Sequence, residues 1–360
     1  MPKSIFEIFE SKAIASYWKD VNSHMQDPMI GSKYFPPSKQ TGLELAWIKG
    51  RNNLPVALQP SAFDTKAPLR DRIGVTELST KMPFFREAMR LGEKDRQDIE
   101  TLLAKGEQFA QPTIMRIFDD TKALVDGAEV QAERMRMSLL YGGAINIASK
   151  GENGRPVGYK YNYDADGTWA ATNKKTLAGT STWTVENKAT STPINDLLDA
   201  AEVLAEKYGV KAVEVLMNTT TFKGMIASES IAKAINPIGA SSIIVTRKTA
   251  KEFVENETNL VITLYDKMYK DETGTDHKFY PDGYVTLLPS YSLGNTWFGT
   301  TPEEFDLMSG NSGASVSIVN TGVAITTIKE AHPVNVQTVV SEIVLPSFER
   351  MDDIYVIKVF

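Results

Sequence analysis

The sequence has no cysteine, only three histidines and no hydrophobic run long enough to cross a bilayer. Without cysteine, disulfide bridges, thiolate metal sites and cysteine nucleophiles are excluded. A membrane-spanning helix needs about 18 uncharged apolar residues in a row, and no such run occurs. Glu7 and Glu10 interrupt the apolar residues near the N-terminus, which a secretory signal would not tolerate. The sequence therefore predicts a protein that is made in a cytoplasm and has no membrane partner.

Local motifs of catalysis and phosphate binding are also missing. Neither G-x-x-x-x-G-K-[ST] nor G-x-G-x-x-G nor H-E-x-x-H occurs, and residues 310–313 (GNSG) fail the nucleophile motif G-x-S-x-G at its last position. His24, His277 and His332 lie far apart, so no shared local metal site is expected. A site assembled through space stays open for each, but the prediction is a surface or structural role. These patterns predict no catalytic residue, no cofactor and no metal.

One segment resembles the start of a calcium-binding loop. Residues 162–167 (NYDADG) follow the opening pattern D-x-[DN]-x-[DN]-G except at the first position, which is Asn162. The twelfth position, which should hold a bidentate Glu, is Asn173. We therefore expect a hairpin turn at Asp166 and Gly167 rather than a calcium site.

Charge and composition describe a folded, mildly acidic chain. The 39 basic and 45 acidic residues give a net charge of −6, so the chain lacks the basic footprint of a nucleic-acid-binding protein. Hydrophobic residues make up 42% of the chain and charged residues 23%, which excludes disorder throughout. The 360 residues suffice for two or three compact units, or for one large α+β body.

The strongest periodic signal predicts one long helix at residues 113–141. Apolar or small residues recur there with the i, i+3, i+4, i+7 spacing of a single helix face. Pro112 suits the first position of the helix, and Gly142 with Gly143 suits its end. At about 1.5 Å per residue such a helix is about 43 Å long and would act as the spine of a domain.

The segments before this helix have too little apolar mass to fold alone. Residues 1–40 could form an amphipathic helix, and two interpretations stay open: an arm on another surface, or a helix packed on its own domain. Residues 41–82 predict an extended β excursion, with a strand at 43–48, its return at 54–58 and a further strand at 75–82. An excursion of this length is usually functional.

Strands and helices are mixed after the long helix, without a regular βαβ repeat. A β-rich stretch is expected at 155–186, including a strand at 182–185, and helices are expected from Pro193 to Gly209 and near 221–234. This order favours an α+β fold. Further strands are expected at residues 213–217, 243–246, 260–264, 284–288, 316–328, 334–344 and 354–359.

Four stretches, in this order along the chain, resemble a known family. They are 48–56 (IKGRNNLPV), 133–145 (ERMRMSLLYGGAI), 279–289 (FYPDGYVTLLP) with 298–304 (FGTTPEE), and 344–348 (VLPSF) with 354–359 (IYVIKV). In these residues the chain resembles the bacteriophage major capsid protein E family, of the lambda major head protein type. The resemblance covers the chain from about residue 40 to the end. Residues 150–190 depart from it.

The resemblance implies the Hong Kong 97-type capsid fold, an α+β fold. It assigns residues 1–40 to an N-terminal arm, 41–82 to an extended loop, 83–150 with 311–360 to a peripheral domain built on the spine helix, and 191–310 to an axial domain. Residues 151–190 are then a β-rich elaboration. The implied function is that of the major head protein of a tailed bacteriophage, a virion component assembled in the host cytoplasm.

The resemblance also implies which partners the chain has. The subunits would join in hexamers and pentamers and enclose double-stranded DNA without reading its sequence, together with scaffold, portal and decoration proteins. In the extended loop we expect buried anchors and basic contacts to an acidic neighbour, namely Trp47, Arg51, Phe63, Arg70 and Arg72. Two alternatives remain, a non-viral compartment of the same fold and an enzyme whose site is assembled through space.

Overall fold

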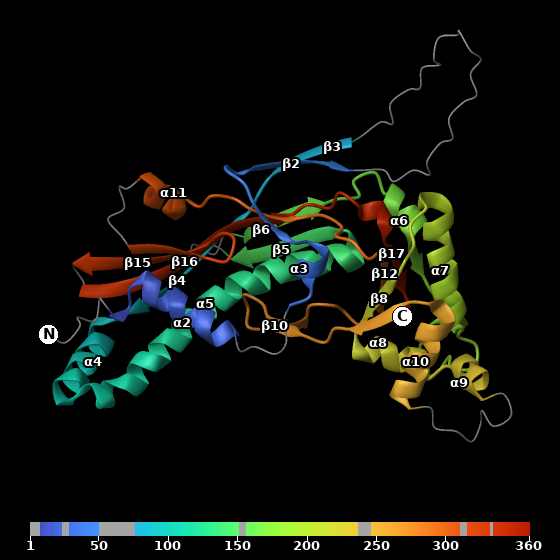
Figure 1. The fold of residues 1–360 in the computed structure, drawn as a ribbon, viewed down its shortest axis with the longest axis horizontal. Helices are drawn as coiled ribbons and strands as arrows, with labels where there is room; N and C mark the ends of the chain where they lie inside the picture. Colours follow the sequence, from blue (N-terminus) through green and yellow to red (C-terminus); the bar gives the residue numbers. More distant parts are fainter. Residues whose placement is uncertain are drawn as a thin grey trace, which may run out of the picture. The chain divides into compact units, whose positions relative to one another are not determined.

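The structure, a computed structural model, describes residues 8–23, 29–49, 76–150, 156–236, 246–309, 315–331 and 334–360 (Figure 1). The chain divides into two compact units. Unit 1 comprises residues 1–46, 79–136 and 295–347, and unit 2 comprises residues 47–78, 137–294 and 348–360. Each unit has its own sheet.

The long helix is present and extends further than the sequence predicts. Helix α5 runs from Glu107 to Gly142, and the left-handed Gly143 (φ 68°) ends it with an N–H that donates to the Leu139 carbonyl at 3.0 Å. The prediction that Pro112 occupies the first helical position is wrong, because the helix begins five residues earlier. Near a helix N-terminus a proline forfeits only one backbone hydrogen bond, and the helix continues past it.

Unit 1 is built on a six-stranded sheet around the long strand β16 (Val334–Pro346). Strand β16 pairs with β15 (Val323–Ala331) along one edge and with β4 (Phe84–Leu91) along the other, and both pairings are antiparallel. The strand predicted at 316–328 is a hairpin of β14 (Ser315–Val319) and β15, which turns at the left-handed Asn320 (φ 50°). Strands β13 (Thr296–Phe298) and β1 (Pro37–Lys39) complete the sheet.

Two helices cover the core of unit 1. Helix α2 (Ser11–Ser23) places Ile14 and Trp18 against α5, in one cluster with strands β14, β15 and β16 (Figure 1). Trp18 Nε1 donates to Asp126 Oδ1 at 2.8 Å. For residues 11–23, the interpretation as a helix packed on its own domain is therefore confirmed. Shorter helices of this unit are α3 (Gly31–Tyr34), α4 (Glu93–Lys105) and α11 (Pro302–Ser309).

Unit 2 is built on a five-stranded sheet flanked by helices. The strand order is β7 (Lys174–Thr176), β17 (Tyr355–Lys358), β12 (Tyr284–Leu288), β8 (Glu214–Met217), β9 (Val261–Leu264), with parallel pairs at both ends. Helix α7 begins at Pro193 and ends before the left-handed Gly209, as predicted. Its apolar face packs in the core of the unit, and the other helices around this core are α8 (Thr219–Ile226), α9 (Glu229–Ile235) and α10 (Arg247–Thr258).

Three two-stranded sheets and one short helix accompany the two larger sheets. Strand β5 (Ala144–Lys150) pairs with β6 (Pro156–Asn162), and α6 (Thr168–Asn173) follows β6. Strand β10 (Met268–Lys270) pairs with β11 (Asp276–Lys278), and β2 (Glu44–Lys49) pairs with β3 (Thr76–Lys81).

In unit 2, the expectations for residues 182–185 and for residues 221–234 are wrong. Residues 182–185 form turns rather than a strand, because Trp183 inserts into the core and its Nε1 donates to Asp196 Oδ2 at 3.1 Å. The helix expected near 221–234 is two helices, α8 and α9. They separate at Ser228, whose side chain donates to the Ser191 carbonyl at 2.7 Å.

The predicted domain boundaries and the compact units divide the chain differently. Range 311–360 contributes β14, β15 and β16 to the sheet of unit 1 and β17 to the sheet of unit 2. Residues 137–150 likewise fall in unit 2 rather than with residues 83–136. The strand predicted at 243–246 lies outside the described residues except for Thr246, which caps α10.

Candidate assembly surfaces

The base of the extended loop is a two-stranded ladder. Strand β2 lies where the sequence predicts a strand, and its partner among the described residues is β3, which confirms the strand expected at 75–82. The proposed return strand at 54–58 lies outside the described residues. Alternation along β2 buries Leu45 and Trp47, which are 1% and 8% exposed.

Trp47 is buried within its own chain. Its ring lies 5.3 Å, centroid to centroid, from the ring of Tyr163, and burial raises the pKa of the Tyr163 phenol well above its ordinary value. Most of the Trp47 surface is thus covered before any neighbour arrives, which the sequence alone did not indicate. The remaining predicted contacts lie outside the described residues: Arg51, Phe63, Arg70 and Arg72.

His277 lies on an exposed hairpin without a catalytic arrangement around it. Its Nε2 is 2.9 Å from Asp271 Oδ2, and its ring stacks on Tyr269 at 5.6 Å. Hydrogen bonds from the Thr273 side chain and the Thr275 backbone hold the pKa of the Asp271 carboxyl well below its usual range. These contacts order the β10–β11 turn. His24 and His332 lie outside the described residues.

The segment that resembles a calcium loop is a strand-to-helix turn rather than the predicted hairpin. Both oxygens of Asp164 accept hydrogen bonds from the Trp169 and Ala170 backbone N–H groups at 2.9 Å, at the start of α6. Asn173 is buried and donates to two backbone carbonyls, those of Asp352 and Ile354. The side chains of this segment thus serve the local backbone. Within the described ranges, no group of three or more His, Asp or Glu side chains could hold a metal ion.

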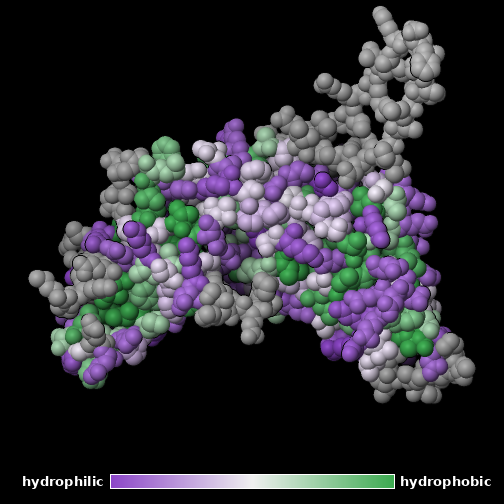
Figure 2. Space-filling model, in the orientation of Figure 1, coloured by the Kyte–Doolittle hydropathy of each residue, from purple (hydrophilic) through white to green (hydrophobic). Residues whose placement is uncertain are grey.

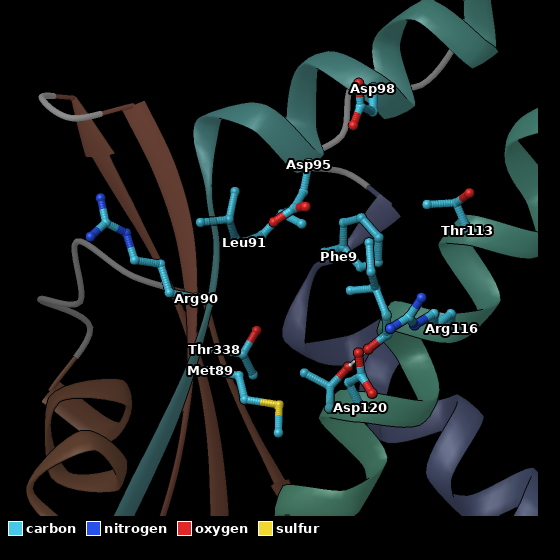
Figure 3. Close-up of a pocket in the computed structure, with 13 residues that line it drawn as sticks. Phe9, Met89, Arg90, Leu91, Asp95, Asp98, Thr113, Arg116, Asp120 and Thr338 are labelled. Carbon is cyan, nitrogen blue, oxygen red and sulfur yellow. Dashed lines mark hydrogen bonds between the residues drawn. The ribbon is translucent and has the colours of Figure 1, made fainter.

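A pocket of about 390 Å³ opens in unit 1 between α4, α5 and the sheet (Figure 3). Its walls combine apolar side chains with three carboxylates and two guanidinium groups, from Phe9, Met89, Arg90, Leu91, Asp95, Asp98, Thr113, Arg116, Ile117, Asp120, Thr121, Val336 and Thr338. The three aspartates are exposed. General acid–base catalysis needs two carboxyl groups in different environments, and these three aspartates share an exposed one.

Helix α11 presents apolar side chains to solvent. Phe305 and Met308 are 63% and 75% exposed, and Figure 2 shows hydrophobic surface over this helix. Its first turn is anchored in unit 1, because Glu303 pairs with Arg86 and Glu304 pairs with Lys39. Exposed apolar surface on a rigid support is typical of a protein–protein contact. The i, i+3 spacing of Phe305 and Met308 is the sequence signal that could have indicated it.

In the part of the chain that the structure describes, no helix is long and apolar enough to span a membrane. Among the described residues, the base of the extended loop and the apolar face of α11 are surfaces that suit contacts between proteins.

The family model of the phage major capsid protein E matches residues 11–359. The chain belongs to the phage major capsid protein E family. No curated protein matches its sequence. A putative capsid protein of a prophage of Escherichia coli CFT073 is similar in structure, with a TM-score of 0.59 and 13% identity over 98% of this chain and 99% of that one. A phage-related protein of Bordetella bronchiseptica RB50 gives a TM-score of 0.53 and 12% identity, over 97% of each chain.

This family membership confirms the recognition made from the sequence. The capsid protein has the mixed α+β fold of the Hong Kong 97 type. It is the major capsid protein of a tailed phage, a structural and non-enzymatic component of the virion that self-assembles into the icosahedral shell.

Proposed function

We propose that the subunits join in hexamers and pentamers, with unit 1 as the peripheral domain on the spine helix and unit 2 as the axial domain near the capsomer centre. Two units with separate sheets and cores support this division. Repeated heterologous contacts between identical subunits close into rings, and rings of six and five build a closed shell.

The extended loop at 41–82 lies across the adjacent subunit in this proposal. Between β2 and β3, residues 50–75 carry four basic and two acidic side chains, a net charge of +2 in a chain of net charge −6. The rest of the subunit therefore carries −8. A basic loop on an acidic neighbour is electrostatically complementary, which favours both encounter and register. The observation that carries the proposal is the pairing of β2 with β3 at the base of the loop. This pairing holds the two ends of the loop together where it leaves the subunit.

Other proteins complete the shell. Scaffold and portal proteins, and decoration proteins on the outside, would meet surfaces of this subunit during assembly. The enclosed double-stranded DNA would meet a mildly acidic subunit, which does not retain it by counterion release as a basic wall would.

Replacing residues 50–75 with a short Gly/Ser linker tests the role of the loop. Because Leu45 and Trp47 are buried in their own chain, β2 and β3 should be kept. We expect a folded subunit that retains its helix content by circular dichroism and sediments only as small species. Normal shells in negative-stain microscopy would contradict the proposal. Global unfolding would show that residues 50–75 belong to the subunit's own core.

Charge reversal separates electrostatics from loop length. The double variant Arg70→Glu with Arg72→Glu should weaken assembly more at low salt than at high salt, because screening removes long-range attraction. The matched control, Lys233→Glu with Lys248→Glu, changes the net charge by the same amount at exposed positions of α9 and α10, at some distance in sequence from the loop. Equal losses in both variants would mean that net charge, rather than the loop contact, controls assembly.

A further inference from the structure

A buried charged group in unit 1 connects segments that are far apart in the sequence. Glu133 of α5 is fully buried, and both of its carboxylate oxygens accept the Gly31 N–H, at 3.0 and 3.1 Å. Arg136 Nη1 lies 3.5 Å from Glu133 Oε2, and its Nε donates to Thr296 Oγ1 at 2.8 Å. Thr296 Oγ1 in turn donates to the Phe35 carbonyl at 2.8 Å. These contacts attach the chain at 31–35 and β13 to the spine helix.

Gly31 is required for this approach. A Cβ atom at Gly31 would overlap Glu133 Oε2 and lie 2.8 Å from Arg136 Cδ. Real Cβ atoms do not come so close, so with any other residue either the segment or the side chains of Glu133 and Arg136 would have to shift. The backbone at Gly31 therefore lies directly on the charged group.

A second carboxyl, that of Glu342, has no such partner. It lies on β16 and is 2% exposed, and neither of its oxygens has a hydrogen-bond partner among the described residues. Two charges act on it, the attractive Arg136 and the repulsive Glu129. Glu129 accepts a hydrogen bond from the Asn320 amide at the β14–β15 turn. Three carboxyl groups, of which Glu133 and Glu342 are buried and Glu129 is half-buried, thus interact with the one guanidinium group of Arg136.

The other elements around Glu342 supply no compensating cation. Its face of β16 also carries Val340, which packs on α5. Opposite Val340 on β4 lies Glu87, which is exposed and acidic. Residues 324–326 of β15 and 296–298 of β13, which lie beside this part of β16, are uncharged. Arg136 is therefore the one buried cation that the described residues place at this site.

An isolated ionised carboxyl in such a place is strongly disfavoured. A buried charge needs pairing and hydrogen bonds, and without them the group keeps its proton instead. Burial raises the pKa of Glu342 well above its ordinary value, and Glu129 adds to the rise while Arg136 opposes it. Burial also raises the pKa of Glu129.

We propose that Glu342, together with Glu129, Glu133 and Arg136, forms a proton-operated lock inside unit 1. With a proton on Glu342, the segment at 31–35, helix α5 and strand β16 stay packed together. Loss of that proton adds the uncompensated negative charge of Glu342 to that of Glu129. The unit then opens so that water reaches the Glu342 carboxylate. The lock gives a shell subunit two conformations whose balance is set by pH.

The direction of the effect follows from proton linkage. The unfolded or opened carboxyl has a pKa of about 4.3. Below that pH the Glu342 carboxyl is protonated in the closed and in the opened state, and the free energy that favours the closed state is at its maximum. As pH rises from there to the raised pKa of the closed state, the closed state alone holds the proton, so opening becomes easier by up to about tenfold per pH unit. The lock is thus closed at low pH and loosened at high pH.

Hydrogen exchange on the full-length subunit tests the lock. The Gly31 amide, which donates to Glu133, should lose protection by up to about tenfold per pH unit between pH 5 and the raised pKa, after correction for intrinsic exchange. The variant Glu342→Gln, which mimics the protonated side chain, should remove most of this slope. The control Glu87→Gln lies on the same face of the sheet and should leave the slope unchanged. An unchanged slope in Glu342→Gln would overturn the proposal.

Infrared spectroscopy gives a second readout that needs no variant to fold. At pH 7 exposed carboxyls are ionised, so a protonated-carboxyl carbonyl band reports a buried proton. We expect this band in the wild type and in Glu87→Gln, and its loss in Glu342→Gln. A wild type without the band at pH 7 would overturn the proposal even if Glu342→Gln proved insoluble.

Discussion

One buried carboxyl group of unit 1, that of Glu342, differs from two buried carboxyl groups of unit 2. In unit 2, Asp196 accepts hydrogen bonds from Trp183 Nε1 at 3.1 Å and from Lys175 Nζ at 3.0 Å, and Glu214 accepts one from Thr263 Oγ1 at 2.5 Å. In unit 1, Glu342 is just as buried but has no hydrogen-bond partner among the described residues. A satisfied carboxyl fixes one arrangement, whereas an unsatisfied one makes the arrangement depend on a proton. We therefore expect unit 2 to behave as a rigid apolar core and unit 1 as the pH-sensitive part.

The largest effect is expected in the core of unit 2. Phe222 of α8 is 1% exposed and packs in that apolar cluster, so Phe222→Ala should lower the free energy of unfolding by about 3–5 kcal/mol. The control Val185→Ala, at a side chain that is 65% exposed, should stay within about 0.5 kcal/mol. Urea unfolding followed by circular dichroism measures both. A small loss for Phe222→Ala would mean that this cluster does not hold unit 2 together.

The spine helix gives the next comparison, in unit 1. Leu124 is 5% exposed and packs with Ile14 and Trp18, so Leu124→Ala should cost about 2–5 kcal/mol. Ile117 lies on the same helix face but is only half-buried and lines the pocket, so Ile117→Ala should cost less. The exposed Arg116 should tolerate Ala within about 0.5 kcal/mol. Equal losses at all three positions in urea melts would contradict the packing of α5.

Local signals in the sequence were sufficient for elements with clear ends. Gly143 stops α5 and Gly209 stops α7 because a left-handed residue favours glycine, and Pro193 begins α7 because its fixed φ suits a first turn. The resemblance supplied the fold and function. Pairings over long distances carried no such signal, since one partner of β16 is β4, about 250 residues earlier. The pairing of β2 with β3 likewise joins segments that are separated in the sequence.

The charged group around Glu342 was equally invisible in the sequence. Its members come from α3, α5, β13 and β16, and apart from Gly31 each is an ordinary polar or charged residue in its own segment. Their burial and their shared guanidinium group exist only after the chain folds. For Trp47 the sequence predicted an assembly contact but could not show that Tyr163 of the same chain already packs on this ring.

A smaller effect is expected from pH on stability, and it should arise in unit 1. Because burial raises the pKa of Glu342, its contribution to stability is present below about pH 4.3 and is lost as pH rises through the raised value, at up to about 1.4 kcal/mol per pH unit. Glu342→Gln should flatten this dependence and be more stable than the wild type at pH 8. Urea melts at several pH values measure it, with Glu87→Gln as the control. If the free energy of unfolding of the wild type did not fall between pH 5 and 8, unit 1 would not be the pH-sensitive unit.

The smallest effect concerns a helix end in unit 2, where no buried charge is involved. The Thr246 hydroxyl caps α10 by accepting the Thr249 N–H at 3.2 Å, so Thr246→Ala should lower the free energy of unfolding by about 1 kcal/mol. Thr246→Ser keeps the hydroxyl and should restore most of the loss. Because this cap has no titrating group, the loss should be the same at pH 5 and pH 8, unlike that expected for Glu342. Hydrogen exchange should rise only in the first turn of α10, since an exposed cap controls fraying rather than the core. A loss of several kcal/mol, or one that changes with pH, would show that unit 2 is coupled to titrating groups after all.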